Sequence, residues 1–429
     1  MGVLGKPAIY LYWSTRSILQ TPIFGKSITR DRFKDILRYL HFCNNDARPA
    51  RDDNNRDPLF KIRKYYAKVT AAFQRVFTPG EFVSVDEGMI RFFGRLSFKT
   101  YNPQKPAKYG MKAYKVCDQS GYTWKFQLYT GKSNYRWRNH RGLVALVMSM
   151  LTGLLHQGRK VFMDNFYTSP TLFLALFRCS TNACGTVRAN RRNMPNELNK
   201  NSAKLRVGES LFMKGKELLG MIWRDKRVFA MLSTMHDNQF ADTGKQDRRT
   251  GENIRKPKMV IDYNKHMGSV DVSDFLTGRY ADLRRSLKWY KKLVFHLSDL
   301  AMTNAYIVFK SVTGKSCTHI DFVLDVIEQL LAEGQMQATD RPKPTSRGKK
   351  SSPVLRRDNP TRLEYATSDH WPTEIPSTDK KQSPTRLCEV CKPARKETRY
   401  FCPPCEVALH PTCFRPYHTL LHYSNSHEE

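Results

Sequence analysis

Four aspartates stand where their carboxylates could bind metal ions. Asp118 and Asp164 each end an apolar, strand-like segment ("KVCD" and "VFMD"), and Asp271 and Asp274 open a helical segment in "GSVDVSD". The i, i+3 spacing of the last two places them on one face of that helix. Clustered carboxylates repel one another unless cations lie between them, and their hard oxygens suit Mg²⁺. Two such ions about 4 Å apart can stabilise the attacking and leaving oxygens of a phosphodiester displacement.

Each aspartate also has an ordinary structural role open to it, because Asp commonly closes turns and caps helices. The four together, in a chain with 72 Lys and Arg against 39 Asp and Glu, favour the metal-binding interpretation. On that interpretation the cofactor is Mg²⁺ or Mn²⁺, with two ions in each active site, and basic side chains hold a polynucleotide.

A second candidate metal site lies in the segment "CEVCKPARKETRYFCPPCEVALHPTCFRPYHTLLH", where pairs of ligands recur with short gaps. A two-residue gap lets two thiolates turn onto one tetrahedral Zn²⁺. Alternation of the pairs predicts a cross-brace with two zinc ions. One ion would be held by Cys388, Cys391, His410 and Cys413, and the other by Cys402, Cys405, His418 and His422.

His427 lies close to His422 and is an alternative ligand. A module this small hardly builds a core without metal, so an unstructured tail with incidental thiols is disfavoured. The remaining cysteines are scattered singly, which indicates a reducing compartment and metal binding rather than disulfides.

The charge balance indicates a polyanionic partner. The formal net charge is +33 at pH 7, and such a surplus most often attracts nucleic acid. A membrane is disfavoured, because the longest apolar stretch, residues 143–155, is too short to span a bilayer and the N-terminus shows no signal-peptide pattern. We therefore expect double-stranded DNA as the partner, no membrane, and a nuclear location.

Basic residues near the candidate acidic site are the candidates for phosphate contact. They are Arg188, Arg191, Arg192, Lys256, Lys258, Arg284, Arg285 and Lys288. A further basic run, "RPKPTSRGKK", lies in a stretch rich in Pro, Ser and Thr. It is typical of a nuclear localisation or DNA-tethering segment, or of a merely solvated linker.

The elements that must position these residues alternate between helices and strands, which predicts a mixed α/β fold. Apolar residues recur at helical spacing before residue 81, where Thr29 is a predicted N-cap, and again over residues 287–331. Between them, β-branched and aromatic residues predict strands. The segment "MVIDY", shortly before Asp271, is also interpreted as a strand.

From about Tyr12 to the C-terminus, the chain resembles piggyBac-type transposases and the genes derived from them. The matching stretches, in the family's order, are "YWST", "ITRDRFKDILRYLHF", "VDEGMIRFFGR", "YNPQKPAKYGMK", "VCD", "MDNFYTS", "GTVRANRR", "MVIDYNK" and "GSVDVSD". So many linked matches make the resemblance specific. It implies an α/β, RNase H-like catalytic core with a β-rich insertion, a flanking helical dimerisation and DNA-binding domain, and a C-terminal cross-brace zinc domain.

The resemblance and the composition together set the expected domain boundaries. The helical domain is assembled from residues 1–80 and 286–335, and the catalytic core from residues 81–190 and 258–285. The insertion covers residues 191–257. A flexible basic linker (336–386) and the zinc domain (387–429) complete the chain.

By the resemblance, Asp118, Asp164 and Asp271 match the three metal-binding aspartates, and Asp274 matches a fourth acidic residue needed nearby. The implied activity is cut-and-paste transposition by a homodimer on DNA, in which transposon terminal repeats are cleaved through hairpin intermediates and joined to TTAA target DNA. The zinc domain would read transposon-end DNA, although cross-braced zinc modules also bind proteins.

One feature departs from the family pattern. Family members usually carry a considerable region before the segment that matches "YLYWST", whereas Met1 here falls almost at the match. We therefore expect either a shortened, domesticated gene product or a chain that begins at an internal methionine. The alternatives to an active transposase are a domesticated nuclear DNA-binding protein that keeps the fold without the reaction, and a chromatin-associated adaptor that acts through the zinc domain.

Overall fold

The computed structural model describes residues 2–47, 49, 53, 57–103, 105, 107–131, 135–201, 205–246, 251–281, 286–339, 370–378, 381–391 and 396–420. The contacts divide the chain into two units, Met1–Thr339 and Asp340–Glu429. Helices and strands alternate in the first unit, which confirms the predicted mixed α/β fold. Among the described residues, no helix has both the length and the apolar character needed to cross a membrane.

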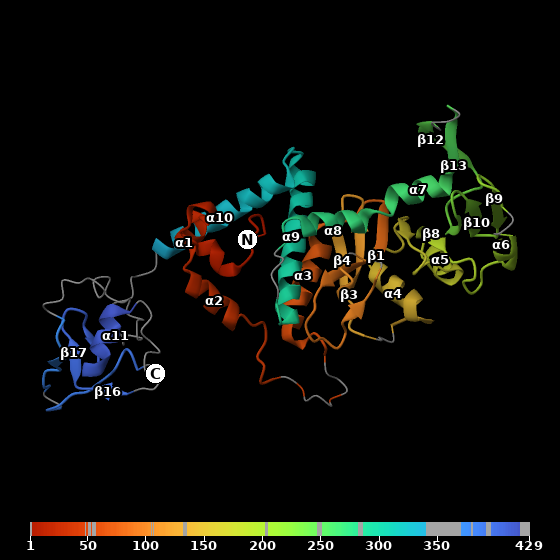
Figure 1. Cartoon of the computed structure of the whole chain (residues 1–429). Coiled ribbons are helices and arrows are strands. Elements are labelled where there is room, and N and C mark those ends of the chain that lie inside the picture. Colours follow the sequence, from red (N-terminus) through yellow and green to blue (C-terminus); the bar gives the residue numbers. More distant parts are fainter. Residues whose placement is uncertain are drawn as a thin grey trace. The chain divides into compact units, whose positions relative to one another are not determined.

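A mixed nine-stranded sheet forms the centre of the first unit (Figure 1). Its order is β2-β3-β1-β7-β8-β11-β10-β9, and β4 also pairs with β3. The strands are β1 (Phe82–Arg91), β2 (Thr100–Tyr101), β3 (Tyr109–Asp118), β4 (Thr123–Leu128), β7 (Lys160–Met163), β8 (Asn182–Val187), β9 (Ser210–Lys214), β10 (Leu219–Arg224) and β11 (Val228–Ser233). Two hairpins lie outside this sheet: β5 (Arg136–Trp137) with β6 (His140–Arg141), and β12 (Phe240–Gln246) with β13 (Asn253–Pro257).

The pairing around β1 decides where the candidate site residues lie. β1 runs antiparallel to β3 and parallel to β7, and β7 runs parallel to β8. Parallel neighbours need a crossover, which α5 (Pro170–Phe177) supplies between β7 and β8. The residue that directly follows β7 therefore lies beside the middle of β1.

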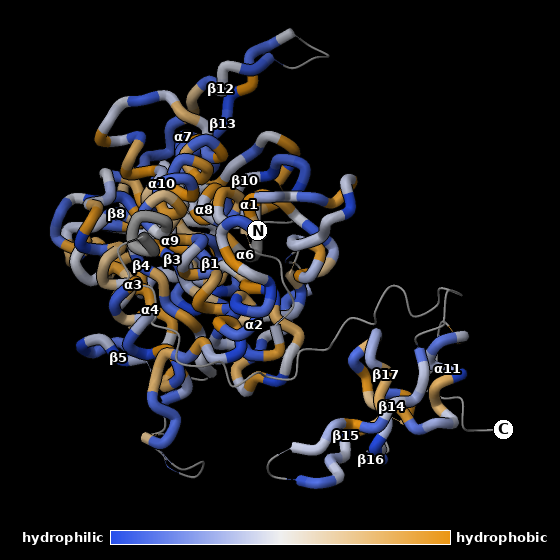
Figure 2. The backbone as a smooth tube through the Cα atoms, turned by 90° about the vertical axis from the view of Figure 1, so that its left-hand side faces the viewer, coloured by the Kyte–Doolittle hydropathy of each residue, from blue (hydrophilic) through white to orange (hydrophobic). Residues whose placement is uncertain are grey.

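Helices cover both faces of the sheet. On one face, α4 (Gly142–Leu151) and α5 pack against Val83 and Val85 of β1. On the other face, α7 (Lys258–His266) packs against Phe162 of β7, and α8 (Ser269–Arg279) packs against β1 and β3. Figure 2 shows that the hydrophobic segments of this unit run through its interior. Because successive side chains of a strand point to opposite faces, neighbours in sequence belong to different cores.

One helix that precedes the strands of the sheet in sequence packs against one that follows them. α3 (Arg63–Val76) contacts α9 (Trp289–Thr313), and both share a core with Ile90 and Phe126. The other helices of this unit are η1 (Ile9–Trp13), η2 (Ser17–Leu19), α1 (Pro22–Ser27), α2 (Arg30–Tyr39), η3 (Phe60–Ile62), α6 (Asn196–Asn201) and α10 (His319–Thr339). The Thr29 hydroxyl accepts a hydrogen bond from the Arg32 amide at 3.3 Å, so the predicted N-cap of α2 is confirmed.

One segment was predicted in the wrong conformation, and two others have a pairing or an end that the sequence did not specify. "MVIDY" lies in α7 rather than in a strand, because Met259, Val260 and Tyr263 pack together on one side of a helix, and short apolar runs do not separate the two structures. The strands predicted within the insertion join the central sheet, since β11 pairs with β8. Helix α10 continues to Thr339, inside the segment interpreted as a linker.

The second unit is built from short strands and one short helix. Its elements are β14 (Thr373–Glu374), β15 (Arg386–Leu387), β16 (Glu397–Thr398), β17 (Tyr400–Cys402), β18 (Val407–Ala408), η6 (Pro411–Cys413) and α11 (Phe414–Thr419). β14, β17 and β18 form one sheet, and β15 pairs with β16. Buried cysteines make up much of the small core, together with apolar residues such as Leu409 and Tyr417.

Gly185 of β8 lets the chain that follows β7 approach closely. A Cβ atom at this position would clash with the Met163 carbonyl oxygen and with the Thr168 hydroxyl. Met163 directly precedes Asp164 in the chain, and Thr168 lies four residues after it. We expect Gly185→Ala to lower the free energy of unfolding by about 2 kcal/mol, because the backbone of the neighbouring strand cannot move aside. Urea unfolding of the full chain measures this loss.

Gly220→Ala in β10 is the matched control. Its Cβ would meet the Leu198 Cδ1 atom at 3.0 Å, and this flexible side-chain end can shift. A loss in the control as large as that of Gly185→Ala would contradict the prediction.

Candidate functional site

The strand register separates two of the predicted aspartates. On β3, Asp118 pairs with Val83, close to the beginning of β1. On β7, the parallel register places Asp164, directly after the strand, level with Asp86. Val83 and Asp86 are about 10 Å apart along the strand, and β1 lies between β3 and β7. Asp86, not Asp118, therefore lies beside Asp164.

The carboxylate of Asp118 closes the turn between β3 and β4. Its Oδ1 atom accepts hydrogen bonds from Ser120 N (3.1 Å), Ser120 Oγ (2.5 Å) and Tyr122 N (3.2 Å). Burial raises the pKa of Asp118, while these hydrogen bonds oppose the shift. Strand pairing leaves Asp118 in a turn on the other side of β1 and does not bring it beside Asp164, contrary to what the sequence had led us to expect.

Asp86, Glu87 and Asp164 form an acidic group where β1 meets β7. Burial, together with the nearby Glu87 and Asp164 carboxylates, raises the pKa of Asp86 to about 7, and the charge of Lys105 opposes this shift. Burial and the Glu87 carboxylate also raise the pKa of Asp164. A cation bound between carboxylates removes such repulsion, so the group has the electrostatic character of a metal site. Asp86 and Glu87 were not predicted site residues, although both lie within "VDEGMIRFFGR", one of the stretches that carry the family resemblance.

Asp86 and Glu87 point to opposite faces of β1. Glu87 accepts a hydrogen bond from the Tyr167 hydroxyl at 2.9 Å, and one of its oxygens lies 3.4 Å from Lys112 Nζ. The register pairs Asp86 with Lys115 of β3, and directly paired residues lie on the same face of a sheet. The Asp86 carboxylate is therefore on the face that helix α8 covers.

Helix α8 brings the Asp274 carboxylate over that face. Asp274 Oδ1 lies 2.5 Å from Lys115 Nζ, and a Cβ atom on Gly88 would lie 3.1 Å from Asp274 Oδ2. Gly88 thus allows α8 to lie close against β1. Asp271, in the first turn of α8, is exposed. Both aspartates lie on one helix, as their i, i+3 spacing predicted.

The acidic residues fit a hard divalent cation. Their donors are all carboxylate oxygens, which suit Mg²⁺ or Mn²⁺ better than softer metals. In the part of the chain that the structure describes, the groups of three or more candidate ligands whose atoms all lie within 4.8 Å of one another contain only Cys and His.

Arg191 holds the loop that follows Asp164. The Asp164 Oδ1 atom accepts a hydrogen bond from Phe166 N at 2.9 Å, and the Arg191 guanidinium donates to the carbonyl oxygens of Asn165, Phe166 and Thr168. Asp164 therefore fulfils a turn role as well. Arg191 was a candidate for phosphate contact, but in the structure it fixes the backbone beside the acidic group.

The other candidate phosphate contacts are in different situations. Four are exposed: Arg188, Arg192, Lys258 and Lys288. Two lie outside the described residues: Arg284 and Arg285. Lys256 lies 3.4 Å from an Asp225 oxygen and over the Trp223 ring, whereas Lys258 is the first residue of α7.

The second unit contains two groups of Cys and His ligands. In each group the four ligand atoms lie within 4.8 Å of one another. The first group is Cys388, Cys391, His410 and Cys413, the set expected from the sequence. Cys391 Sγ lies 3.5 Å from His410 Nδ1 and 3.7 Å from Cys413 Sγ. These separations suit four ligands around one tetrahedral Zn²⁺.

The second group consists of His370, Cys402, Cys405 and His418. His370 Nδ1 lies 3.3 Å from Cys402 Sγ and 3.4 Å from Cys405 Sγ. His370 thus occupies the position that the sequence analysis assigned to His422, which lies outside the described residues.

His370 was not a predicted zinc ligand, because it lies in the segment interpreted as a flexible linker. Pairing of Thr373 with Phe401 joins β14 to β17, and this pairing brings His370 to the strand that ends at Cys402. The available signal was the segment "HWPTEIP", which has apolar residues within a polar stretch and contains the buried Ile375.

Backbone carbonyl groups orient two of the histidines. His410 Nε2 lies 3.1 Å from the Glu397 carbonyl oxygen, and His418 Nδ1 lies 2.7 Å from that of Phe414. Such contacts select the tautomer in which the other ring nitrogen is free to bind metal, as in zinc sites. The Cys₃His and Cys₂His₂ sets therefore fit Zn²⁺ in both ligand type and orientation.

The zinc content of variants distinguishes His370 from His422. We expect the full chain to bind about two zinc ions and His370→Ala to bind about one, because a tetrahedral structural site needs four protein ligands. His422→Ala should retain both ions. Metal analysis of the purified proteins measures the ratio. If only His422→Ala loses an ion, the assignment made from the sequence is the right one.

The raised pKa of Asp86 predicts a pH-dependent stability. The carboxyl binds its proton more tightly in the folded chain, with a pKa of about 7, than at the ordinary value of 3.8. Its contribution to stability therefore falls as pH rises between these two values. In buffer without Mg²⁺, Asp86→Asn should stabilise the chain more at about pH 7.5 than at about pH 5.5, by on the order of 1 kcal/mol.

Urea unfolding at the two pH values measures this difference. Asp31→Asn, at an exposed carboxylate on α2, reports the effect of losing a surface charge. An Asp86→Asn gain that does not change with pH would count against a buried, mutually repelling acidic group.

Comparison with known proteins gives a consistent result. Residues 1–306 match the family described as Transposase IS4. The chain is 27% identical to the human PiggyBac transposable element-derived protein 3 over an alignment of 431 residues. This alignment covers 97% of this chain and 68% of that protein. It is 26% identical over 320 residues to the human PiggyBac transposable element-derived protein 2, and this match covers 71% of the chain and 52% of that protein.

The fold is also shared with a solved structure. The cryo-EM structure of a piggyBac transposase synaptic complex with hairpin DNA superposes with a TM-score of 0.66 at 22% identity, covering 93% of this chain and 83% of that chain. The family match spans most of the chain and agrees with the relatives and the fold. The chain therefore belongs to the piggyBac-type Transposase IS4 family.

Proposed function

We propose that this protein is a DNA transposase that cuts and joins DNA strands by metal-dependent phosphoryl transfer. One observation carries the proposal: Asp86 and Asp164 are neighbours across two parallel strands, and α8, which also carries Asp271, brings Asp274 to the face it covers. Membership of a transposase family supports the reaction class.

The strand order supports an RNase H-like catalytic core. β4, β3 and β1 form an antiparallel ribbon, and β7 and β8 continue it parallel to β1. This arrangement places a carboxylate in the middle of β1 beside a carboxylate at the end of β7. The resemblance seen in the sequence implied this core, and the order of the strands is compatible with it.

Asp86, Asp164 and Asp271 would hold the divalent cations through their carboxylate oxygens. A pair of Mg²⁺ or Mn²⁺ ions, when bound, supplies activation of the nucleophile and stabilisation of the leaving oxygen. Asp274 is kept beside these residues by its ion pair with Lys115. The hydrogen bonds from Arg191 keep the Asp164 loop in place while DNA enters and leaves.

We extend the proposal to the reaction course that the resemblance implies. The solved relative is a complex with hairpin DNA. On this basis the protein would cleave transposon ends through hairpin intermediates and join them to TTAA target DNA. Each step is an in-line phosphoryl transfer, so the side chains have to position the reacting groups and need not form a covalent bond to DNA.

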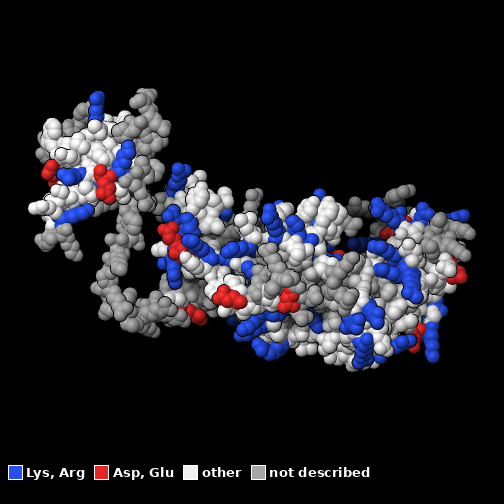
Figure 3. Space-filling model, turned by 90° about the horizontal axis from the view of Figure 1, so that it is seen from below, with Lys and Arg blue, Asp and Glu red and all other residues white. Residues whose placement is uncertain are grey.

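Double-stranded DNA is the proposed partner. The formal charge is +33, and on the face shown in Figure 3 Lys and Arg side chains are spread over the first unit with few acidic side chains among them. Arg188, Arg192, Lys258 and Lys288 are exposed and remain the candidates for phosphate contact. The helices α3 and α9 would belong to the domain that dimerises on DNA, and the location would be nuclear.

The second unit would be a zinc domain that binds transposon-end DNA. Two zinc ions would be held by the two Cys and His groups, with His370 as a ligand. A protein-binding role for the same module is the rival, because cross-braced zinc modules serve both uses.

A domesticated DNA-binding protein without transposition activity is the alternative function. The observation in its favour is that two relatives are named as transposable element-derived proteins. The acidic group at Asp86 and Asp164 favours the enzyme, because a protein that only binds DNA has no need to bury repelling carboxylates.

Asparagine substitutions test the catalytic assignment. Asp86→Asn and Asp164→Asn should each lower strand cleavage by about a thousandfold or more, because the amide keeps the shape but loses the charge that holds a cation. The double variant should lose little beyond either single variant, since the residues act as one unit. Cleavage of DNA that carries the element's own ends, with Mg²⁺, measures the effect.

Asp118→Asn is the matched control, because Asn can accept the same turn hydrogen bonds. It should cleave DNA at close to the normal rate. Binding of DNA in a mobility-shift assay should be nearly unchanged in all these variants. Normal cleavage by Asp86→Asn together with loss of cleavage in Asp118→Asn would return the catalytic role to Asp118, and normal cleavage by all variants would favour the alternative function.

A further inference from the structure

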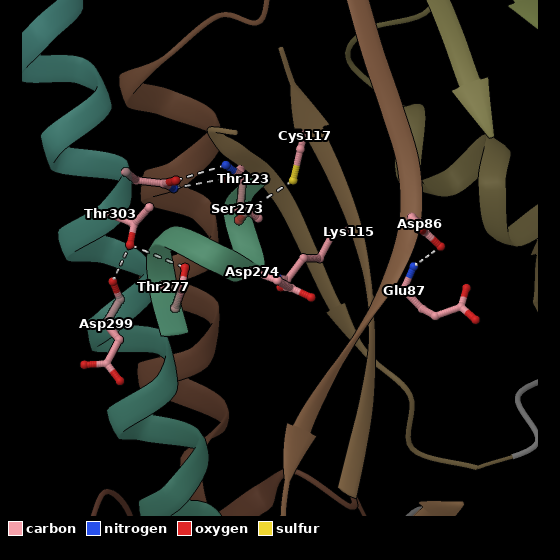
Figure 4. A network of polar contacts seen from close by, with 11 residues as sticks. Asp86, Glu87, Lys115, Cys117, Thr123, Ser273, Asp274, Thr277, Asp299 and Thr303 are labelled. Atoms are coloured by element: carbon pink, nitrogen blue, oxygen red, sulfur yellow. Dashed lines mark hydrogen bonds and ion pairs between the residues drawn. The ribbon is translucent and has the colours of Figure 1, made fainter. Parts of the chain in front are cut away.

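A buried lysine lies inside the acidic site. Lys115, on β3, has a side chain only 1% exposed, and its Nζ atom lies 2.5 Å from Asp274 Oδ1. The Asp274 side chain is 38% exposed, so one partner of this ion pair is buried and the other borders the solvent. Lys115 is also the direct cross-strand neighbour of Asp86. Figure 4 shows Lys115 and Asp274 meeting between β3 and α8.

Burial of a lysine at this position destabilises the fold unless another group compensates its charge. The flanking residues on the same face of β3, Ala113 and Cys117, are fully buried, as an ordinary core strand requires. Burying an ammonium group costs several kcal/mol unless an opposite charge and good geometry compensate for it. Apolar residues of similar volume usually replace such pairs without loss of stability. The pair with Asp274 is therefore poorly explained as a device for folding alone.

Lys115 is the fully buried cation beside Asp274, whereas Lys105 is the lysine whose charge lowers the pKa of Asp86 and of Asp164. On α9, His296 also faces the pair, but burial and the nearby Lys115 charge lower the pKa of His296 to about 3, so it is neutral. Lys112, three residues earlier on β3, lies beside Glu87 on the opposite face. Lys105 lies in a cleft bordered by Arg91 and Asp274 and is only partly buried.

We propose that Lys115 is the fixed counter-charge of the acidic site, a positioning residue that holds Asp274 against β1 and keeps the carboxylates together when no divalent cation is bound. The proposal rests on the proposed metal-binding function of this site. Lys115 compensates the Asp274 charge directly and so limits the repulsion that Asp274 adds to Asp86 and Asp164, on which the Lys105 charge acts. The same positive charge repels a bound cation, so Lys115 also limits how tightly the site holds Mg²⁺.

Replacement of Lys115 by methionine tests both parts of the proposal. Methionine is unbranched, flexible and apolar, so it can fill the same space without the charge. In buffer without Mg²⁺, Lys115→Met should melt at a lower temperature than the wild type. Its dissociation constant for Mg²⁺ should be smaller by on the order of tenfold, because one unit of positive charge close to the cation is removed. Addition of Mg²⁺ should therefore raise its melting temperature more than that of the wild type.

The measurements use the full chain, purified without chelator so that the second unit keeps its metal. Mg²⁺ is a suitable probe because it does not compete for cysteine ligands. Isothermal titration gives its affinity, and thermal melting gives the stability. Lys115→Arg keeps the charge and should restore the Mg²⁺ affinity of the wild type. Lys125→Met is the matched control, since Lys125 is a partly buried lysine of β4 that donates to the Ser149 carbonyl oxygen rather than to a carboxylate.

The outcomes separate this inference from the proposed function. If the wild type binds Mg²⁺ and Lys115→Met binds it with the same affinity, Lys115 is only structural and the inference is wrong. If neither the wild type nor any variant binds Mg²⁺, the metal-dependent function itself fails.

A second pair of variants covers the case in which Lys115→Met does not fold. Asp274→Asn leaves Lys115 without its partner, and Lys115→Met combined with Asp274→Asn removes both charges. The double variant should bind Mg²⁺ about tenfold more tightly than Asp274→Asn, because the two differ only by the lysine charge. Equal affinities in this pair would overturn the inference.

Discussion

Parallel pairing of β1 with β7 forces Asp86 and Asp164 into neighbouring positions, and two carboxylates so placed repel each other. The sheet register leaves them no freedom to separate, because both lie at or beside strands whose other residues are buried. Much of the surrounding structure restrains or offsets this repulsion. Lys115 pairs with the carboxylate that α8 contributes, and Arg191 ties down the loop after Asp164.

The face alternation of β1 divides the acidic residues between two environments. Glu87 faces Tyr167 and Lys112, where a hydrogen bond and an ion pair satisfy it. Asp86 faces the helix α8, where Gly88 permits close approach and Asp274 pairs with Lys115. Of these two adjacent carboxylates, Glu87 therefore has a hydroxyl donor and a lysine partner, whereas Asp86 Oδ1 accepts a hydrogen bond from the Glu87 amide at 2.7 Å. This division follows from strand geometry alone.

The second unit has a different source of stability from the first. Its segments are too short to bury much apolar surface, and cysteines provide a large part of its core. The two groups of Cys and His side chains, which come from distant segments, hold this unit together in place of a large hydrophobic core. His370 shows the consequence, since a residue far from the cysteine pairs in sequence becomes part of the group once β14 pairs with β17.

The sequence by itself determined the features that depend on local chemistry and spacing. Helical periodicity with Thr29 as the cap predicted α2, the i, i+3 spacing put Asp271 and Asp274 on one helix, and the two-residue gaps predicted the group of Cys388, Cys391, His410 and Cys413. Linked motifs were sufficient to recognise the family, because a long ordered series of matches does not arise by chance.

Only the tertiary structure decided which aspartates meet. Asp118 and Asp164 look alike in sequence, since each ends a strand and accepts turn hydrogen bonds through its Oδ1 atom. What separates them is strand register: β3 runs antiparallel to β1 and brings its end to Val83, whereas β7 runs parallel and brings its end to Asp86. Strand direction and register depend on long-range pairing and on which face is buried, and no local pattern of residues encodes them.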